Sequence, residues 1–250
     1  MHEYILYSHI PYQREKQVLG ILAGLTGVQP VEIHEQVLIY AQVKVPEVAV
    51  SKKVRQTQQL PKKPDPAYHK IWREVVNHDN GTASGGEWHF RAEQTPEPGV
   101  ATFISRGVTE HKATEAELER LKQPEWYQFK RYYGILGYRF VHNNVIIRVY
   151  RMIVPIELED REGDGLIEAG PRPADLMKLV DASGSLIVEA LVRVATFDKP
   201  NPAEDRTKKD KQSVADTAKK ELLGLQAAMD GAVDLYAPDR LALETRARNV

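Results

Sequence analysis

The segment from residue 126 to residue 155, WYQFKRYYGILGYRFVHNNVIIRVYRMIVP, limits most strongly what this chain can fold into. Between residues 145 and 154 nearly every side chain is apolar, β-branched or aromatic, which is typical of a β-strand. Turn chemistry flanks this run, with Asn143 just before it and Gly134 and Gly137 further upstream. We therefore expect a β-strand that begins at a turn and forms part of a sheet.

Both faces of this strand are apolar. The odd-numbered face carries Val145, Ile147, Val149 and Ile153, and the even-numbered face carries Ile146, Tyr150, Met152 and Val154. Only Arg148 and Arg151 interrupt the pattern. A strand with one face in water would alternate apolar and polar residues, so we expect a cover on each face, either a second layer of this chain or another protein.

The rest of the chain is rich in strand patterns, with a few helical ones. The patterns predict strands at 2–8, 31–45, 87–94, 100–109 and 185–197, and helices at 13–26, 114–123 and 214–229. Residues 87–109 read as a hairpin, residues 185–197 as a neighbour of the 145–154 strand, and residues 68–76 as either helix or strand. The fold class that follows is β-rich α+β, a multistranded antiparallel β barrel with a short N-terminal helix and a longer C-terminal helix.

Segments that lack an apolar period mark the loops. Residues 46–86 hold clustered lysines and prolines and predict a flexible insertion, and residues 198–211 predict a loop. Residues 157–173 are acidic and glycine-rich, and residues 174–180 fit one helical turn that buries Leu176, Leu179 and Val180. We expect residues 1–250 to form a single β-barrel domain.

Composition excludes several classes of protein. The chain has 34 basic and 35 acidic residues, so no global field attracts it to nucleic acid or to an acidic membrane surface, and we expect no sequence-specific nucleic-acid binding. Cysteine is absent, which excludes disulfides and thiolate metal sites. No segment approaches the roughly 20 apolar residues that a membrane span needs, so we expect no membrane contact.

No motif in the sequence indicates catalysis, a cofactor or a metal. The eight histidines are scattered, and neither a G-x-S-x-G elbow nor a phosphate-binding glycine loop is present. One acidic pattern leaves an alternative open, because Glu157 and Glu159 followed by Arg161 resemble the Glu-x-Glu-x-Lys strand with which a barrel phosphohydrolase holds a divalent ion. A solvated acidic loop explains the same residues, so we expect a protein that is not an enzyme.

The two-sided strand suggests where a partner could bind. Our interface hypothesis names Ile146, Tyr150 and Met152 on one face, or Ile147 and Val149 on the other, as residues that help to cover the sheet with a partner. The alternative is that the barrel and its own helices fill both faces.

Several segments, in this order, resemble the Mediator subunit 18 family, whose members belong to the head module of the Mediator coactivator. They are MHEYILYSHIP at the start, LxGLTG at 22–27 with Pro30, EWHFR at 87–91, GYRFVHNNVIIRVYRMIVP, SGSLIVEALVRV, and AVDLYAPDRLALETRAR near the end. The residues at 46–86 and 198–211 correspond to variable insertions.

The resemblance implies a barrel related to tunnel-type RNA triphosphatases, without the catalytic Glu-x-Glu-x-Lys on the first strand. It implies a noncatalytic subunit in the nucleus that supports transcription by RNA polymerase II. The implied partners are Mediator subunit 20 in a heterodimer, the C-terminal helix of Mediator subunit 8, other head subunits and the polymerase II preinitiation complex. The remaining alternative is a tunnel-fold phosphohydrolase or a protein that binds RNA 5′ ends.

Overall fold

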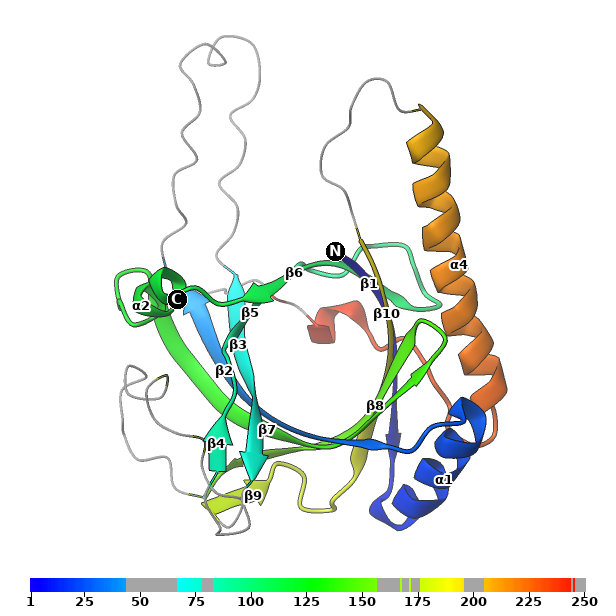
Figure 1. Cartoon of the computed structure of the whole chain (residues 1–250), viewed down its shortest axis with the longest axis horizontal. Helices are drawn as coiled ribbons and strands as arrows, with labels where there is room; N and C mark the ends of the chain where they lie inside the picture. Colours follow the sequence, from blue (N-terminus) through cyan, green and yellow to red (C-terminus); the bar gives the residue numbers. More distant parts are fainter. Residues whose placement is uncertain are drawn as a thin grey trace.

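The computed structural model describes residues 1–43, 67–77, 83–156, 167, 171, 176–195, 205–243 and 245 (Figure 1). Within these ranges the strands form one antiparallel sheet that curls and closes on itself, with helices packed against the outside. No helix in the described ranges is long and apolar enough to span a lipid bilayer. The expected class, a β-rich antiparallel barrel with a short N-terminal and a longer C-terminal helix, is confirmed.

Eight strands of the described chain close the barrel. They are β1 (His2–Ile10), β2 (Val31–Gln42), β3 (Tyr68–Asn77), β5 (His89–Glu93), β6 (Ile104–Lys112), β7 (Tyr127–His142), β8 (Val145–Pro155) and β10 (Leu186–Val194). Around the ring the order is β1, β6, β5, β3, β2, β7, β8, β10, and β10 returns to β1. Two short strands lie beside the ring: β4 (Ala83–Gly85) pairs with β3, and β9 (Met177–Leu179) pairs with β8.

The β7–β8 hairpin forms at the segment that dominates the sequence. Asn143 has a φ of 54°, a left-handed conformation that asparagine tolerates in a two-residue turn. Gly134 and Gly137 lie inside β7 and not in a turn, which corrects the expectation. The reason is close packing, because a Cβ on Gly137 would overlap the carbonyl oxygen of Val149 on β8.

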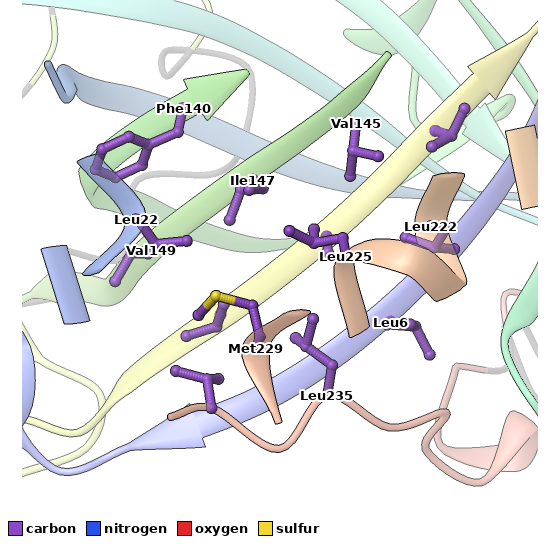
Figure 2. Close-up of a cluster of buried hydrophobic side chains, with 14 of the residues drawn as sticks. Leu6, Leu22, Phe140, Val145, Ile147, Val149, Leu222, Leu225, Met229 and Leu235 are labelled. Atoms are coloured by element: carbon purple, nitrogen blue, oxygen red, sulfur yellow. The ribbon is translucent and has the colours of Figure 1, made fainter. Parts of the chain in front are cut away.

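Helices α1 (Glu15–Thr26) and α4 (Asp205–Met229) cover one side of the barrel (Figure 1). The apolar residues of α4 that face the sheet are Ala218, Leu222, Leu225 and Met229, the set predicted from helical spacing. Figure 2 shows Leu222, Leu225 and Met229 of α4 and Leu22 of α1 in one cluster with Val145, Ile147 and Val149 of β8. Gly27 ends α1 with a φ of 69°, as the sequence predicted.

A second cluster lies outside the barrel beneath helix α2 (Glu115–Leu121). The predicted capping box is confirmed, since the Thr114 hydroxyl accepts from the Glu117 backbone N–H and the Glu117 carboxylate accepts from the Thr114 backbone N–H. Leu121 is buried in this cluster, and Leu118 packs at its edge.

The expected insertion at 46–86 needs correction, because part of it belongs to the barrel. Residues 68–77 form β3, which pairs with β2 on one side and β5 on the other, and residues 83–85 form β4. The sequence leaves residues 68–76 open between helix and strand because their alternation is imperfect, and the structure shows a strand in which Lys70 and Trp72 point into the lumen and Ile71 and Arg73 point outward. Residues 46–66 and 78–82 lie outside the described ranges.

Two further boundaries differ from the expectation. The predicted loop at 198–211 overlaps α4, which begins at Asp205; its first turns are polar, and apolar spacing therefore did not reveal them. The predicted helical turn at 174–180 is wrong, because residues 177–179 form β9, and Leu176, Leu179 and Val180 are exposed. The Val180 N–H donates to Met152 O at 2.9 Å, so the edge of β8 supplies the backbone partners that one isolated helical turn would lack.

Candidate functional site in the barrel lumen

The barrel lumen holds a cavity of about 730 Å³. Strand alternation places one set of side chains from each strand inside, and many of these are charged. The basic side chains on the cavity wall include Lys70, Arg91, Arg106, Arg148 and Arg193, and the acidic ones are Glu35, Glu93, Glu110 and Glu189. Glu3 is fully buried, and its carboxylate contacts three of the arginines that line the cavity.

A network of ion pairs joins the strands on one side of the lumen. The Glu3 carboxylate of β1 accepts from Arg91 Nη2 at 2.7 Å and from Arg193 Nε at 2.9 Å. Glu93 accepts from Arg91 Nε at 2.7 Å and from Arg106 Nη1 at 2.9 Å. Burial alone would raise the pKa of Glu93, but Lys70, Arg106 and Arg91 together hold that pKa well below the usual carboxyl range. These carboxylates are therefore ionised and engaged by cations.

A second group of charges surrounds Arg148 on β8. Arg148 Nη2 donates to Glu35 at 2.6 Å, and its Nη1 donates to Glu189 at 3.4 Å. The Tyr7 hydroxyl donates to Glu189 at 3.0 Å. Burial would lower the pKa of Arg148, but Glu189 and Glu35 raise it above its ordinary value. The residue that broke the apolar pattern of β8 thus carries a charge balanced inside the barrel.

Two tyrosines that line the lumen have hydroxyls outside these networks. Tyr133 and Tyr150 line the cavity and are each 9% exposed, and neither hydroxyl makes a hydrogen bond to the described part of the chain. Burial raises the pKa of both phenols, and for Tyr150 the nearby Glu189 raises it further. Both hydroxyls are therefore neutral donors at ordinary pH.

The C-terminal segment enters the lumen. Tyr236 exchanges two backbone hydrogen bonds with Tyr7 of β1, Tyr7 N to Tyr236 O at 2.9 Å and Tyr236 N to Tyr7 O at 2.8 Å. The short helix η4 (Arg240–Leu243) follows, and Figure 1 places it within the opening of the barrel. Leu243 packs against the buried cluster of Ile5, Ile104 and Leu191. One part of the lumen thus already accommodates a peptide segment.

The five residues of the interface hypothesis divide between the two faces of β8. Ile147 and Val149 are buried beneath the helices, and Figure 2 shows them in that cluster. Ile146, Tyr150 and Met152 point inward; Tyr150 is buried, and the other two are partly buried. The second layer that we expected over the strand is therefore present on its outer face, and the barrel interior covers the other. A contact of these residues with a partner remains a prediction.

The acidic pattern of Glu157, Glu159 and Arg161 lies outside the described ranges. In the part of the chain that the structure describes, no three potential metal ligands come together. The lumen charges were not predicted, although the sequence carries a signal for them: Arg91 lies between Phe90 and Ala92, and Arg106 alternates with Ile104 and Val108 on one strand face. Charged residues in such positions indicate an interior that must pair them.

Comparisons with known proteins agree along the whole chain. A family model described as Med18 protein matches residues 2–246. Mediator of RNA polymerase II transcription subunit 18 from Yarrowia lipolytica is 22% identical over 99% of this chain and 100% of its own length. The corresponding subunit from Neosartorya fischeri is 24% identical over the same shares. A chain of the Schizosaccharomyces pombe Mediator head module matches with a TM-score of 0.64 and 17% identity, over 95% of this chain and 99% of that one.

Proposed function

The chain belongs to the Med18 family, and from this membership we propose that it is a noncatalytic interaction subunit of the Mediator head module. In this role it supports regulated transcription by RNA polymerase II in the nucleus through contacts between proteins. The observation that carries the proposal is the family match from residue 2 to residue 246, which covers the described barrel and both covering helices.

The chemistry of the lumen is consistent with this role. Its carboxylates at Glu3, Glu93 and Glu189 accept hydrogen bonds from arginines or a tyrosine within the chain. A carboxylate engaged in this way is a poor ligand for a divalent ion, because binding the ion would leave a buried arginine without its partner. The lumen thus uses its charges to hold strands together.

The partners that we propose are Mediator subunit 20, the C-terminal helix of Mediator subunit 8, other head subunits and the polymerase II preinitiation complex. Of the five interface residues, Ile146 and Met152 are the two most able to contact a partner directly, because they are only partly buried on the lumen face. Tyr150 lies deeper on the same face. Ile147 and Val149 contribute by supporting α4, because they are buried beneath it.

The test is purification of the tagged full chain from nuclear extract of its own organism, with mass spectrometry of the proteins that accompany it. Mediator subunits 20 and 8 are expected at near-equal amounts to the tagged chain. A purification that recovers the folded chain without any Mediator subunit contradicts the proposal.

The interface residues are tested by charge insertion. Met152→Asp and Ile146→Asp are expected to reduce recovery of subunit 20 several-fold. The control Val76→Asp alters an apolar side chain on β3 that is 53% exposed, and recovery should stay unchanged. Thermal unfolding of each variant distinguishes loss of a contact from loss of folding. Full recovery of subunit 20 with both lumen variants would show that Ile146 and Met152 are not part of the interface.

A further inference from the structure

The C-terminal segment crosses the lumen between two backbone anchors. At one end Tyr236 exchanges its two hydrogen bonds with Tyr7 of β1, and at the other Thr245 O accepts from the Tyr68 N–H of β3 at 2.9 Å. Figure 1 shows the segment passing through the opening of the barrel from the side of β1 toward the side of β3. We call residues 236–243 together with Thr245 the strap.

The edge of β1 beside the strap is only partly used. β1 parts from β6 after Ile5, and the N–H and C=O of Tyr7 face the side that β6 has left, where Tyr236 bonds to them. Alternate residues of a strand direct their backbone groups to the same side, so the N–H and C=O of His9 face this edge as well. No backbone group in the described part of the chain bonds to them there. The edge therefore has one further pair of hydrogen bonds to offer.

Attachment to α4 explains why the strap leaves this pair unused. In the antiparallel register of the Tyr7 bridge, Asp234 would lie opposite His9. The chain is held to the helix just before the bridge, because Gln226 Nε2 of α4 donates to Leu235 O at 2.6 Å. Asp234 accordingly forms no bridge. A segment that is not attached to α4 could pair with both Tyr7 and His9.

An apolar pocket lies next to the same edge. Ile5 of β1 is paired with Ile104 of β6 and with Leu191 of β10, so the three side chains meet on the lumen face. Leu243 of the strap packs against them. The rest of the strap is less closely held, since one isolated bridge joins it to β1 and Leu241 is 63% exposed. Segments with few buried contacts open at a lower free energy than the sheet around them.

We propose that the strap occupies a groove for an extended segment of a partner protein, which binds by replacing the strap. The segment pairs antiparallel with Tyr7 and His9 as an added strand and places a leucine-sized side chain in the pocket of Leu243. In such complexes main-chain hydrogen bonds give affinity and side-chain pockets give specificity. The segment gains one more hydrogen-bonded pair than the strap has, but it binds only the fraction of chains whose strap is open. The inference goes beyond the proposed function and does not depend on it.

The first experiment measures fluorescence anisotropy of a labelled synthetic peptide with the sequence of residues 232–245, titrated with the full-length chain. Leu243→Ala in the chain weakens the strap and leaves the groove intact, so this variant should bind the peptide about tenfold more tightly than the wild type. A peptide that carries Leu243→Asp should not bind. Equal binding of the unaltered peptide to wild type and variant overturns the proposal, and so does absence of binding to both.

The matched control is Leu241→Ala in the chain. It shortens a leucine of the same strap whose side chain is 63% exposed, so the affinity for the peptide should equal that of the wild type. If Leu241→Ala tightens binding as much as Leu243→Ala does, the pocket of Leu243 is not the site and the proposal is wrong. Circular dichroism spectra confirm that each variant is folded.

A reversible lock tests whether the strap must leave. Tyr7 and Tyr236 form a hydrogen-bonded antiparallel pair, and the Cα separation of about 5.5 Å in such pairs suits a disulfide. The natural chain has no cysteine, so Tyr7→Cys with Tyr236→Cys can form one intramolecular disulfide and no other. The oxidised form should lose peptide binding, and the reduced form of the same protein should retain it. Equal affinities of the two forms would contradict replacement of the strap.

Two further measurements identify the edge and the occupant. Hydrogen exchange at the His9 amide, which the strap leaves unpaired, should slow when the peptide binds Leu243→Ala, and unchanged exchange rules out pairing with this edge of β1. Sedimentation of Leu243→Ala without peptide should show a monomer at all concentrations. A dimer that forms with rising concentration would identify the strap of a second copy as the occupant and overturn the assignment to a partner protein.

Discussion

Replacing Glu3 by glutamine tests whether ion pairs in the lumen hold the first strand in the barrel. β1 pairs with β6 through only residues 2–5, whereas it pairs with β10 along its full length. The Glu3 carboxylate spans this short seam, since it contacts Arg91 of β5, Arg106 of β6 and Arg193 of β10. Glutamine keeps the shape and removes the charge, so the change isolates the electrostatic contribution.

The expected loss follows from what the arginines retain. Breaking a buried ion pair by removing one partner costs about 3–5 kcal/mol, because the remaining charge stays buried. Here Arg91 keeps Glu93, and Arg193 keeps Glu110 and is 34% exposed at its side chain. We therefore expect the lower end, about 3 kcal/mol. With a urea dependence of about 2–3 kcal/mol per molar, the unfolding midpoint should fall by about 1–1.5 M.

The dependence on pH gives the prediction a second readout. Burial would raise the pKa of Glu3, but Arg91, Arg106 and Arg193 lower it below the ordinary value of 4.5. The folded state then binds fewer protons than the unfolded state, so this contribution is present above about pH 4.5 and is lost as the pH falls through the folded pKa. The difference between wild type and Glu3→Gln should be greatest at pH 7 and should shrink below about pH 4.5.

The assay is urea unfolding followed by tryptophan fluorescence at pH 7 and at pH 4. The control Glu87→Gln removes the exposed partner of Lys112 and should leave the midpoint unchanged, since exposed pairs contribute little. A wild-type midpoint for Glu3→Gln at pH 7 would refute the reasoning, because the buried arginines would then need no partner at this seam.

Three further changes test packing and titration. Leu222→Ala should cost about 2–5 kcal/mol in urea unfolding because it opens a cavity beneath α4, whereas its neighbour Leu223, 36% exposed, should tolerate alanine within about 0.5 kcal/mol; equal losses would contradict the packing of α4. Gly137→Ala should abolish recovery of soluble folded protein, since its Cβ overlaps the β8 backbone, while Gly24→Ala in α1 meets no atom within 4 Å and should fold normally; normal folding of both would contradict the close approach. Burial lowers the pKa of His69 to about 4, so the wild type should lose stability as the pH falls from about 6.5 to about 4, and His69→Gln should flatten that decline; a parallel decline in both would exclude His69 as its source.

Much of the barrel could be predicted because strand and helix periods differ strongly in this sequence. The β8 pattern predicted a strand covered on both faces, and its pairing with β10 follows that prediction, with Val149 opposite Val188. The spacing of Leu222 and Leu225 predicted the buried face of α4. In these elements the apolar period and the tertiary contacts agree, so local sequence was sufficient.

The lumen could not be predicted in the same way. Whether a charged residue on a strand points to water or into a closed barrel depends on strands distant in sequence: Glu3 and Arg193 are 190 positions apart and meet only when β1 pairs with β10. The same limit applies at short range to residues 174–180, because seven residues can fit a helical or an extended pattern equally well. The pairing of residues 177–179 with the edge of β8 determines that they form a strand. In both cases, pairing between strands determined the structure, and the spacing of residues along the chain was not sufficient to predict it.

Closure of the ring between β1 and β10 has a consequence for synthesis on the ribosome. β1 precedes the other strands of the barrel and pairs with residues 186–194, and Tyr7 bonds to Tyr236, so the barrel cannot close until the chain through β10 has been translated. A product truncated before β10 would expose two sheet edges that the complete protein conceals, and such edges are templates for aggregation. An unclosed barrel therefore differs from a closed one by two exposed strand edges, to which chaperones and proteases can bind.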